Sequence, residues 1–219
     1  KVIGGYMVFT KMHGAGNDYV YVDCTKEELD NPSEVAIKVS DRHTGIGSDG
    51  LILIKSSDKA DFFMEMYNAD GSQGKMCGNG IRCVGKYVYD NGLTDKTTVN
   101  IDTLAGIKIL ELNIGTDGKV ATAKVNMGCP VLEAADIPMD ISALKDYKAV
   151  YKDILSNAKD TGLSKVAVKA LSEVTNAVVA EKIEVNGGIY EITGVSMGNP
   201  HGIVSVSYTH LTLPTILRV

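Results

Sequence analysis

The amino-acid sequence predicts an α+β fold in which short strands accompany one well-marked helix. Apolar runs of strand type recur along the first 126 residues, separated by polar or glycine-rich turns. The segment 78–91 instead repeats its apolar residues at three- and four-residue spacings, which is typical of a helix. Cys129 and Pro130 follow the last of these strands and predict a junction between two parts of the chain, near residues 125–130.

Each element is expected in a definite place. Strands are predicted at 7–12, 19–23, 51–55, 62–67, 99–102, 107–113 and 120–126, with the glycine-rich turn HGAGND at 13–18. The helix should end at Asn91, because Gly92 can close it in the left-handed conformation. Beyond the junction, a helical stretch is predicted over 141–158, and short strands over 182–206 around a turn at 186–188.

Size, charge and cysteine content exclude several classes of protein. The 219 residues are 44% hydrophobic with a net charge of −5, which describes a globular protein and argues against a nucleic-acid binder. No apolar run approaches the roughly 18 residues of a membrane span, and no secretion leader precedes Met7. We therefore expect a cytoplasmic protein with four free thiols, Cys24, Cys77, Cys83 and Cys129.

The segment MCGNGIRC, residues 76–83, carries the clearest chemical signal. It places Cys77 directly before a helix that opens with Gly78, Asn79 and Gly80. The first backbone N–H groups of a helix lack internal partners and carry partial positive charge, which favours a thiolate nearby. Glycines also let a carboxylate approach these groups. The segment therefore predicts a proton-transferring thiol beside an anion-binding backbone, and a small buried cysteine in a tight turn is the alternative.

The second cysteine of this segment is expected to serve packing. Cys83 lies six residues after Cys77, roughly 240° around the helix, so the two thiols cannot easily share a site. Their spacing is a weak zinc pattern because no second pair of ligands lies nearby. No metal site is predicted.

Four segments, taken in order, resemble the diaminopimelate epimerase family. They are FTKMHGAGND at 9–18, DR at 41–42 with GIGSDG at 45–50, NADGS at 68–72 with CGNGIRC at 77–83, and SMGNPH at 196–201. The resemblance covers nearly all of residues 7–206. It implies an enzyme that interconverts LL- and meso-diaminopimelate, in lysine and cell-wall precursor biosynthesis, with no cofactor.

The resemblance also implies a fold and a set of site residues. The fold would be two similar lobes of mixed antiparallel sheet around a central helix, with the second lobe incomplete. Two cysteines would exchange the roles of base and acid, and Cys77 matches one of them, supported by His201. The substrate-binding matches are Asn17, Asn68, Gly78, Asn79 and Asn199. The expected partner is the small-molecule substrate, without nucleic acid or membrane, and a homodimer is one option for assembly.

The sequence departs from the family in two ways. The family's second cysteine, with a Glu-Arg pair in a glycine-rich segment, has no match here, so this chain alone is expected to be inactive. The segment of about 140–180 is longer than expected and indicates a helical insertion or a partner surface, with a solvated amphipathic helix as the alternative. The expected domains are therefore a catalytic lobe at 7–127 and a partial second lobe at 128–206.

Both ends are expected to be non-native. Residues 1–6 precede a suitable start at Met7. Residues 206–211, VSYTHL, can be back-translated to codons that contain the end of a sequencing-library transposon. We therefore interpret 207–219 as adapter read-through, and an ordinary tail ending in a strand is the alternative.

Two other functions fit parts of the pattern. A proline racemase or a phenazine-biosynthesis-type isomerase would share the paired-lobe fold. A non-catalytic fragment could still hold a carboxylate at Gly78 and Asn79. The set of asparagines and the sequence around Cys77 favour diaminopimelate epimerase over the related isomerases.

Overall fold

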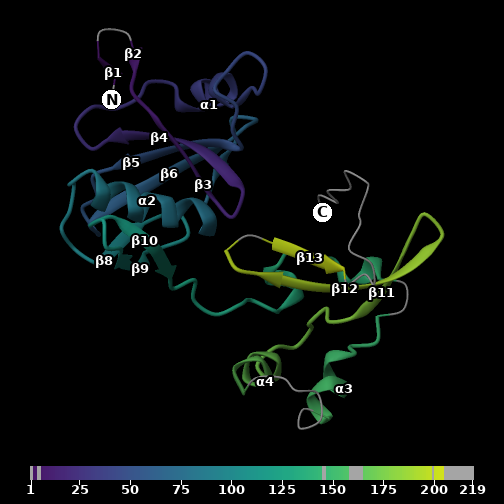
Figure 1. The fold of residues 1–219 in the computed structure, drawn as a ribbon. Coiled ribbons are helices and arrows are strands. Elements are labelled where there is room, and N and C mark those ends of the chain that lie inside the picture. The colour runs from purple at the N-terminus through teal and green to yellow at the C-terminus, as the bar shows by residue number, and fades with distance from the viewer. Residues whose placement is uncertain (1, 4–5, 145–146, 158–164, 199, 205–219) are drawn as a thin grey trace. The chain divides into compact units, whose positions relative to one another are not determined.

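A computed structural model describes residues 2–3, 6–144, 147–157, 165–198 and 200–204 (Figure 1). The chain forms two compact units, residues 1–127 and residues 128–219, named unit 1 and unit 2. None of the helices in the described part of the chain is long and apolar enough to cross a membrane.

Unit 1 is built on one mixed sheet, preceded by a ribbon of β1 (Val2–Ile3) and β2 (Tyr6–Met7). The strand order in the sheet is β10-β9-β8-β6-β5-β4-β3, and β7 pairs with β6 beside this path. The pairs β4–β5 and β6–β8 run parallel, and the other neighbours run antiparallel. The strands are β3 (Thr10–Gly14), β4 (Asn17–Cys24), β5 (Gly50–Lys55), β6 (Phe62–Asn68), β7 (Gln73–Gly74), β8 (Thr98–Asp102), β9 (Lys108–Ile114) and β10 (Val120–Val125).

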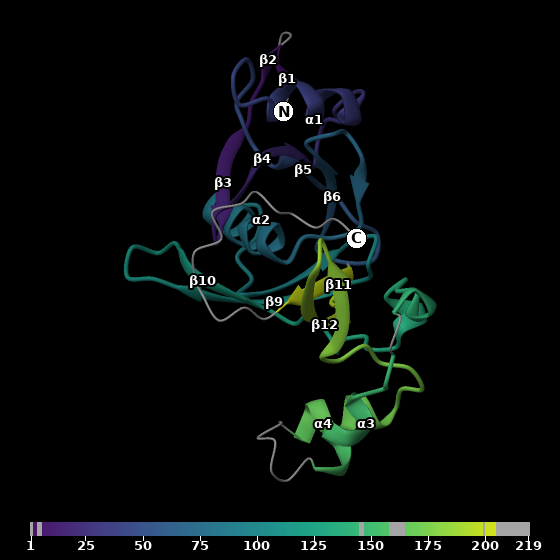
Figure 2. The same cartoon turned by 90° about the vertical axis from the view of Figure 1, so that its right-hand side faces the viewer.

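Helix α2 (Gly78–Asp90) lies at the centre of unit 1. It contacts the strands at both edges of the sheet, β3 and β10, as well as β4 and β9, so the sheet curves around it (Figure 2). Its apolar face carries Ile81, Val84 and Val88, all fully buried against sheet residues such as Ile52 and Ile54. The predicted α+β class with a mixed sheet around a central helix is confirmed.

The helix also ends where the sequence predicts. The backbone N–H of Asn91 donates to the carbonyl oxygen of Tyr87 at 3.0 Å. Gly92 follows with a φ of +69°, and the N–H of Leu93 then bonds back to the carbonyl oxygen of Val88 at 2.9 Å. A left-handed glycine therefore closes α2, as glycine commonly does after a helix.

The opposite face of the sheet is covered by helix α1 (Pro32–Ser40), which the sequence analysis did not predict. Its Ala36 packs with Val20 and Val22 of β4 and with Leu51 and Leu53 of β5. Five of the six residues of β5 are buried, as expected for an interior strand with helices on both faces. The short helix was missed because only nine residues carry its pattern.

Unit 2 contains a three-stranded antiparallel sheet of β11 (Glu181–Val185), β12 (Gly188–Ser196) and β13 (Pro200–Val204). The predicted turn between the first two is confirmed, because Asn186 and Gly187 both have positive φ, as a two-residue hairpin loop requires. The remaining elements are the 3-10 turns η1 (Ala134–Asp136) and η2 (Ile141–Ala143) and the helices α3 (Tyr151–Ser156) and α4 (Lys165–Ser172).

The prediction of one helical stretch over 141–158 is wrong. The described residues instead form η2, an irregular segment at 147–150 and the six-residue helix α3. The carboxylate of Glu181, which is 1% exposed, accepts the backbone N–H groups of Lys148 at 3.0 Å and Val150 at 2.8 Å. Ala149 between them has a φ of +51°, which a helix does not allow. A tertiary contact therefore overrides the local helical pattern.

Candidate active site

Segments far apart in the sequence meet where three neighbouring strands of the unit 1 sheet, β4, β5 and β6, begin or end. Strand β4 begins at Asn17, and the parallel strand β5 begins at Gly50. Asn68 ends the antiparallel strand β6 and lies opposite Gly50. The start of α2 packs against the same region, since a Cβ added at Gly14 would lie 2.7 Å from the backbone oxygen of Asn79. The sheet register therefore places the predicted residues of unit 1 close to one another, at these strand ends and at the start of α2.

Cys77 occupies the N-cap position of α2 and is half-buried. Its Sγ accepts the backbone N–H of Gly80 at 3.3 Å. The same sulfur donates to Oδ1 of Asn17 at 3.2 Å. One contact favours the thiolate and the other favours the thiol, so this sulfur has a partner in either protonation state.

The first turn of α2 leaves backbone donors open beside this thiol. The N–H groups of Gly80 and Ile81 bond to Cys77, but those of Gly78 and Asn79 find no acceptor among the described residues. The guanidinium of Arg82 donates to the Gly78 carbonyl oxygen at 3.1 Å and to Oδ1 of Asn79 at 2.8 Å, which adds positive charge. The helix start can therefore bind an anionic group.

The glycines of the helix start differ in what surrounds them. The sequence predicts that they leave room for a ligand. A Cβ at Gly80 would instead lie 2.7 Å from Cδ1 of Ile52, so this glycine permits close packing of α2 on β5. At Gly78 a Cβ would meet the end of the Met127 side chain at 3.2 Å, which is a tight but flexible neighbour. Only Gly78 therefore faces a region where a ligand could displace a side chain.

Tyr19 is a neighbour of this thiol and is 5% exposed. Burial raises the pKa of the Tyr19 hydroxyl well above its usual range, and the neighbouring Cys77 adds to the effect by its charge and by hydrogen bonding. The phenol therefore stays protonated across the physiological range.

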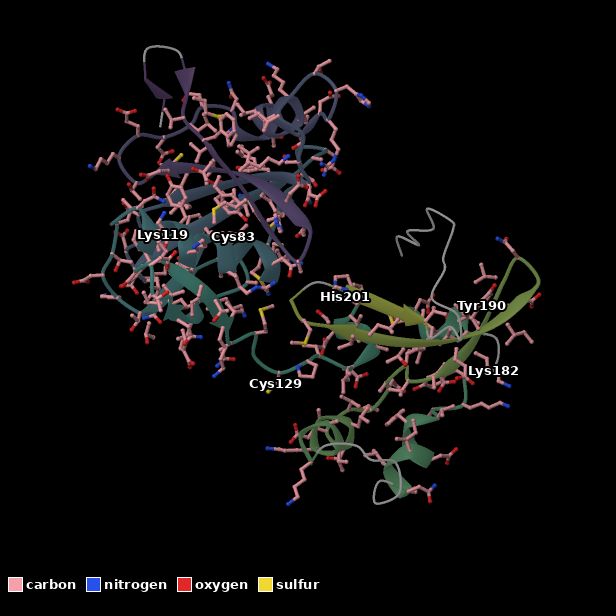
Figure 3. The ribbon with its side chains drawn as sticks, in the orientation of Figure 1. Cys83, Lys119, Cys129, Lys182, Tyr190 and His201 are labelled. Atoms are coloured by element: carbon pink, nitrogen blue, oxygen red, sulfur yellow. The ribbon has the colours of Figure 1, made fainter. Side chains whose placement is uncertain are left out.

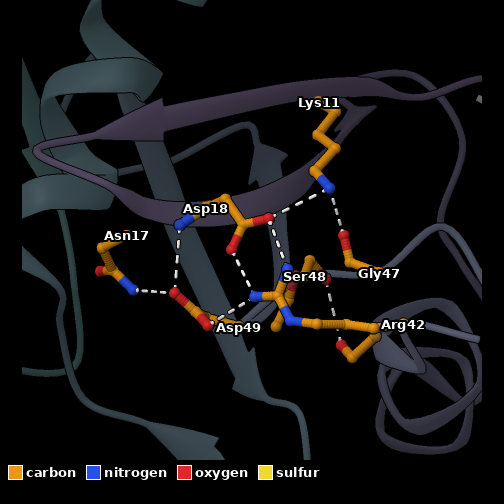
Figure 4. A network of polar contacts seen from close by, with 9 residues as sticks. Lys11, Asn17, Asp18, Arg42, Gly47, Ser48 and Asp49 are labelled. Carbon is orange, nitrogen blue, oxygen red and sulfur yellow. Dashed lines mark hydrogen bonds and ion pairs between the residues drawn. The ribbon is translucent and has the colours of Figure 1, made fainter. Parts of the chain in front are cut away.

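A charged network begins beside Asn17 (Figure 4). Arg42 donates to Asp18 at 2.7 Å and to Asp49 at 3.0 Å, and Lys11 pairs with Asp18 at 3.1 Å. Hydrogen bonding from Arg42 is the largest cause that lowers the pKa of the Asp18 carboxyl to about 2. Nδ2 of Asn17 donates to Oδ2 of Asp49 at 2.6 Å, which connects the network to Cys77. These charged residues lie within the family motifs, but the sequence alone predicts no role for any of them.

The remaining predicted site residues lie in different places. Asn68 is half-buried, and its Nδ2 donates to Oγ of Ser72 at 2.9 Å, within the turn that follows β6. His201 lies in β13 of unit 2, opposite Val195, and is exposed (Figure 3). Asn199 lies outside the described residues. The structure therefore brings Asn17 into contact with Cys77 and puts Asn68 at the end of β6, two strands away from Asn17 in the sheet.

The other cysteines have different surroundings. Cys24 and Cys83 are buried, and burial raises the pKa of both thiols. Cys83 packs in the core around α2, as predicted, and Cys129 is exposed. All four thiols are free. No group of three or more histidine, cysteine or acidic side chains in the described part of the chain could hold a metal ion.

The fold is found in solved structures of other proteins. A hydroxyproline epimerase from Agrobacterium vitis matches with a TM-score of 0.57 at 11% identity, covering 90% of this chain and 51% of that one. A probable proline racemase from Agrobacterium radiobacter K84 matches with a TM-score of 0.56 at 12% identity, covering 91% and 52%. At such identities the likeness concerns the fold alone. The chain thus has the fold of one solved epimerase and one probable racemase.

Comparison of the sequence with those of known proteins identifies the family. The family model of diaminopimelate epimerase matches residues 9–133. A diaminopimelate epimerase from Acetivibrio thermocellus is 48% identical over 197 residues, which cover 90% of this chain and 59% of the relative. The chain belongs to the diaminopimelate epimerase family. It spans 59–61% of the length of five of the curated relatives that it matches.

Proposed function

We propose that this chain supplies one side of a cofactor-independent active site that interconverts LL- and meso-diaminopimelate, with Cys77 as an acid/base thiol. The observation that carries the proposal is the position of its sulfur. Sγ lies between the N–H of Gly80 and Oδ1 of Asn17, next to the open N–H groups of Gly78 and Asn79. Membership of the family supports the choice of substrate.

The proposed chemistry is a proton transfer at the α-carbon. The substrate carboxylate would accept the N–H groups of Gly78 and Asn79, which stabilise negative charge as it develops. The Cys77 thiolate would take the α-proton, and the electron pair of the C–H bond would delocalise toward the carboxylate. A thiol on the opposite face would then donate a proton, which inverts the centre.

The other matched residues have supporting roles in this proposal. Asn17, Asn68 and Asn199 would bind the zwitterion, because an amide both donates and accepts hydrogen bonds. His201 would support the pair of thiols. The second thiol and its Glu-Arg pair have no match in residues 1–219, so we propose that this chain alone inverts no centre. The proposal also includes a cytoplasmic location, which fits a small-molecule substrate and free thiols. It requires neither nucleic acid nor a membrane. It is compatible with assembly as a homodimer.

The test is exchange of the α-proton in heavy water, followed by NMR and by stereochemical analysis of diaminopimelate. We expect residues 1–219 to incorporate deuterium slowly without inversion. Replacing Cys77→Ala should lower that exchange by about 10²–10⁴-fold, the usual contribution of a general acid/base group. Cys129→Ala is the matched control, because this thiol is exposed and lies in unit 2, and it should leave exchange unchanged.

Two outcomes would contradict the proposal. Deuterium exchange that is unchanged in Cys77→Ala would show that another residue is the base. Inversion by residues 1–219 at a normal enzymatic rate would show that these residues contain the second acid. Binding of diaminopimelate with no exchange would favour the non-catalytic carboxylate-binding alternative. Joining residues 7–206 to the part of the Acetivibrio thermocellus relative that this chain does not cover should restore inversion.

A further inference from the structure

We propose that Asp49 is a positioning residue that fixes which end of the Asn17 amide faces Cys77. The inference rests on the proposed acid/base role of Cys77. Its geometric basis is one short chain of contacts. Oδ2 of Asp49 accepts Nδ2 of Asn17 at 2.6 Å, and Oδ1 of Asn17 accepts the thiol of Cys77 at 3.2 Å.

The chemistry of the three groups allows only this direction. An ionised carboxylate accepts hydrogen bonds and donates none, so the amide atom that faces Asp49 must be the nitrogen of Asn17. The carbonyl end of the amide is thereby left for Cys77. A flipped amide would turn two oxygen acceptors toward each other at Asp49 and would present N–H groups to the sulfur.

Asp49 is itself held in place from several sides. The backbone N–H of Asp18 donates to Oδ2 at 3.1 Å, and Arg42 donates to Oδ1 at 3.0 Å (Figure 4). The backbone N–H of Asp49 bonds to the carbonyl oxygen of Asp18 at 2.7 Å, and its own carbonyl oxygen accepts the N–H of Ala69 at 3.0 Å. Both carboxylate oxygens and both main-chain groups are therefore engaged.

This orientation affects the protonation state of the thiol. The carbonyl of Asn17 stabilises the S–H form, and the N–H of Gly80 stabilises the thiolate. Releasing the amide lets its N–H groups turn to the sulfur, so the Asn17 amide and the Gly80 N–H would then both favour the thiolate. Asp49 thus keeps Cys77 able to serve as either acid or base.

The test measures the rate at which iodoacetamide alkylates Cys77 in residues 1–219 at neutral pH, by peptide mass spectrometry. We expect Asp49→Ala to speed alkylation about three- to tenfold, the effect of exchanging one hydrogen bond for another at this sulfur. The alkylation rate of the exposed Cys129 serves as the internal reference for reagent concentration. The buried Cys24 and Cys83 should stay unalkylated, which shows that the core is intact.

Two controls separate orientation from charge. Asp18→Ala removes an equal charge from the same network but leaves the bond between Asn17 and Asp49, and it should change the rate less than twofold. In an Asn17→Ala background, Asp49→Ala should likewise have little effect, because the amide through which it acts is gone. Equal effects of Asp18→Ala and Asp49→Ala, a full effect without Asn17, or no acceleration by Asp49→Ala would each overturn the inference.

A second measurement needs no substitution. In the unchanged chain, the side-chain amide protons of Asn17 should show a nuclear Overhauser effect to the backbone N–H of Asp18, because both groups donate to one oxygen of Asp49. A stronger effect to the β protons of Cys77 would show the flipped amide and refute the inference. Neither test needs substrate or turnover, so its failure differs from a failure of the proposed epimerase activity.

Discussion

The sheets of the two units bury their residues very differently. In unit 1, α1 and α2 cover opposite faces of the sheet, and Ile52 and Ile54 of β5 have no exposed surface. In unit 2, all five residues of β13 are exposed, and Ile203 is 50% exposed. Burial against helices on both faces makes the unit 1 sheet a fixed frame, and that frame carries the candidate site.

The two carboxylates beside the candidate site also differ in their hydrogen-bond partners from two carboxylates of unit 2. In unit 1, Asp18 and Asp49 bond mainly to side chains at strand ends, where they orient Arg42 and Asn17. In unit 2, Glu133 and Glu181 accept backbone N–H groups of irregular segments. The first use positions functional groups, and the second replaces the hydrogen bonds that regular secondary structure would supply.

The largest expected effect concerns the two sheets. Ile52→Ala should lower the free energy of unfolding of unit 1 by about 2–5 kcal/mol, because it leaves a cavity between β5 and α2. Ile203→Ala in β13 should change stability by less than about 0.5 kcal/mol. Urea titrations followed by circular dichroism would measure both. Equal losses of stability would show that β13 is covered in solution.

A smaller effect concerns the buried carboxylate of unit 2. Glu181→Gln turns one acceptor into an NH₂ group that faces a backbone N–H, which should cost about 1–3 kcal/mol. Hydrogen–deuterium exchange should then accelerate at Lys148 and Val150 and stay unchanged in unit 1. Glu191→Gln is the matched control, since this residue is exposed in the same sheet. Unchanged protection at both amides would show that Glu181 does not hold the segment.

The third expected effect is the pH dependence of the contribution that Asp18 makes to stability. Its pKa is lowered in the folded protein to about 2, from the usual 3.8, so its contribution to stability is complete above pH 4. That contribution should disappear as the pH falls through about 2. Other carboxylates titrate in the same range, so the measurement is the difference in melting temperature between the unchanged chain and Asp18→Asn. A constant difference from pH 5 to pH 2 would contradict the ion pair with Arg42.

The sequence predicted those elements whose pattern is local. The spacing of Ile81, Val84 and Val88 indicates α2, and Asn91 with Gly92 marks its end. It failed where distant residues decide the conformation. The segment around Ala149 carries a helical pattern, but Glu181, more than thirty residues away, holds its backbone in another shape.

In the candidate site, too, the local features could be predicted from the sequence and the long-range contacts could not. The position of Cys77 before a helix could be predicted from the sequence around it, and family motifs indicated Asn17. The contact between Asn17 and Asp49 could not, because it depends on the register of two parallel strands joined by a long crossover. Asp49 and Arg42 lie within the family motifs, but a motif does not show which atoms of its residues are in contact.

The parallel pairing of β4 and β5 also bears on the order of folding. The hairpin of β3 and β4 joins neighbours in sequence and can close quickly. The pairing of β4 with β5 must wait until the crossover at residues 25–49 closes, which is slower. Cys77 and Asn17 lie 60 positions apart, so their contact requires both steps. We therefore expect the thiol environment to be among the last parts of unit 1 to form during refolding.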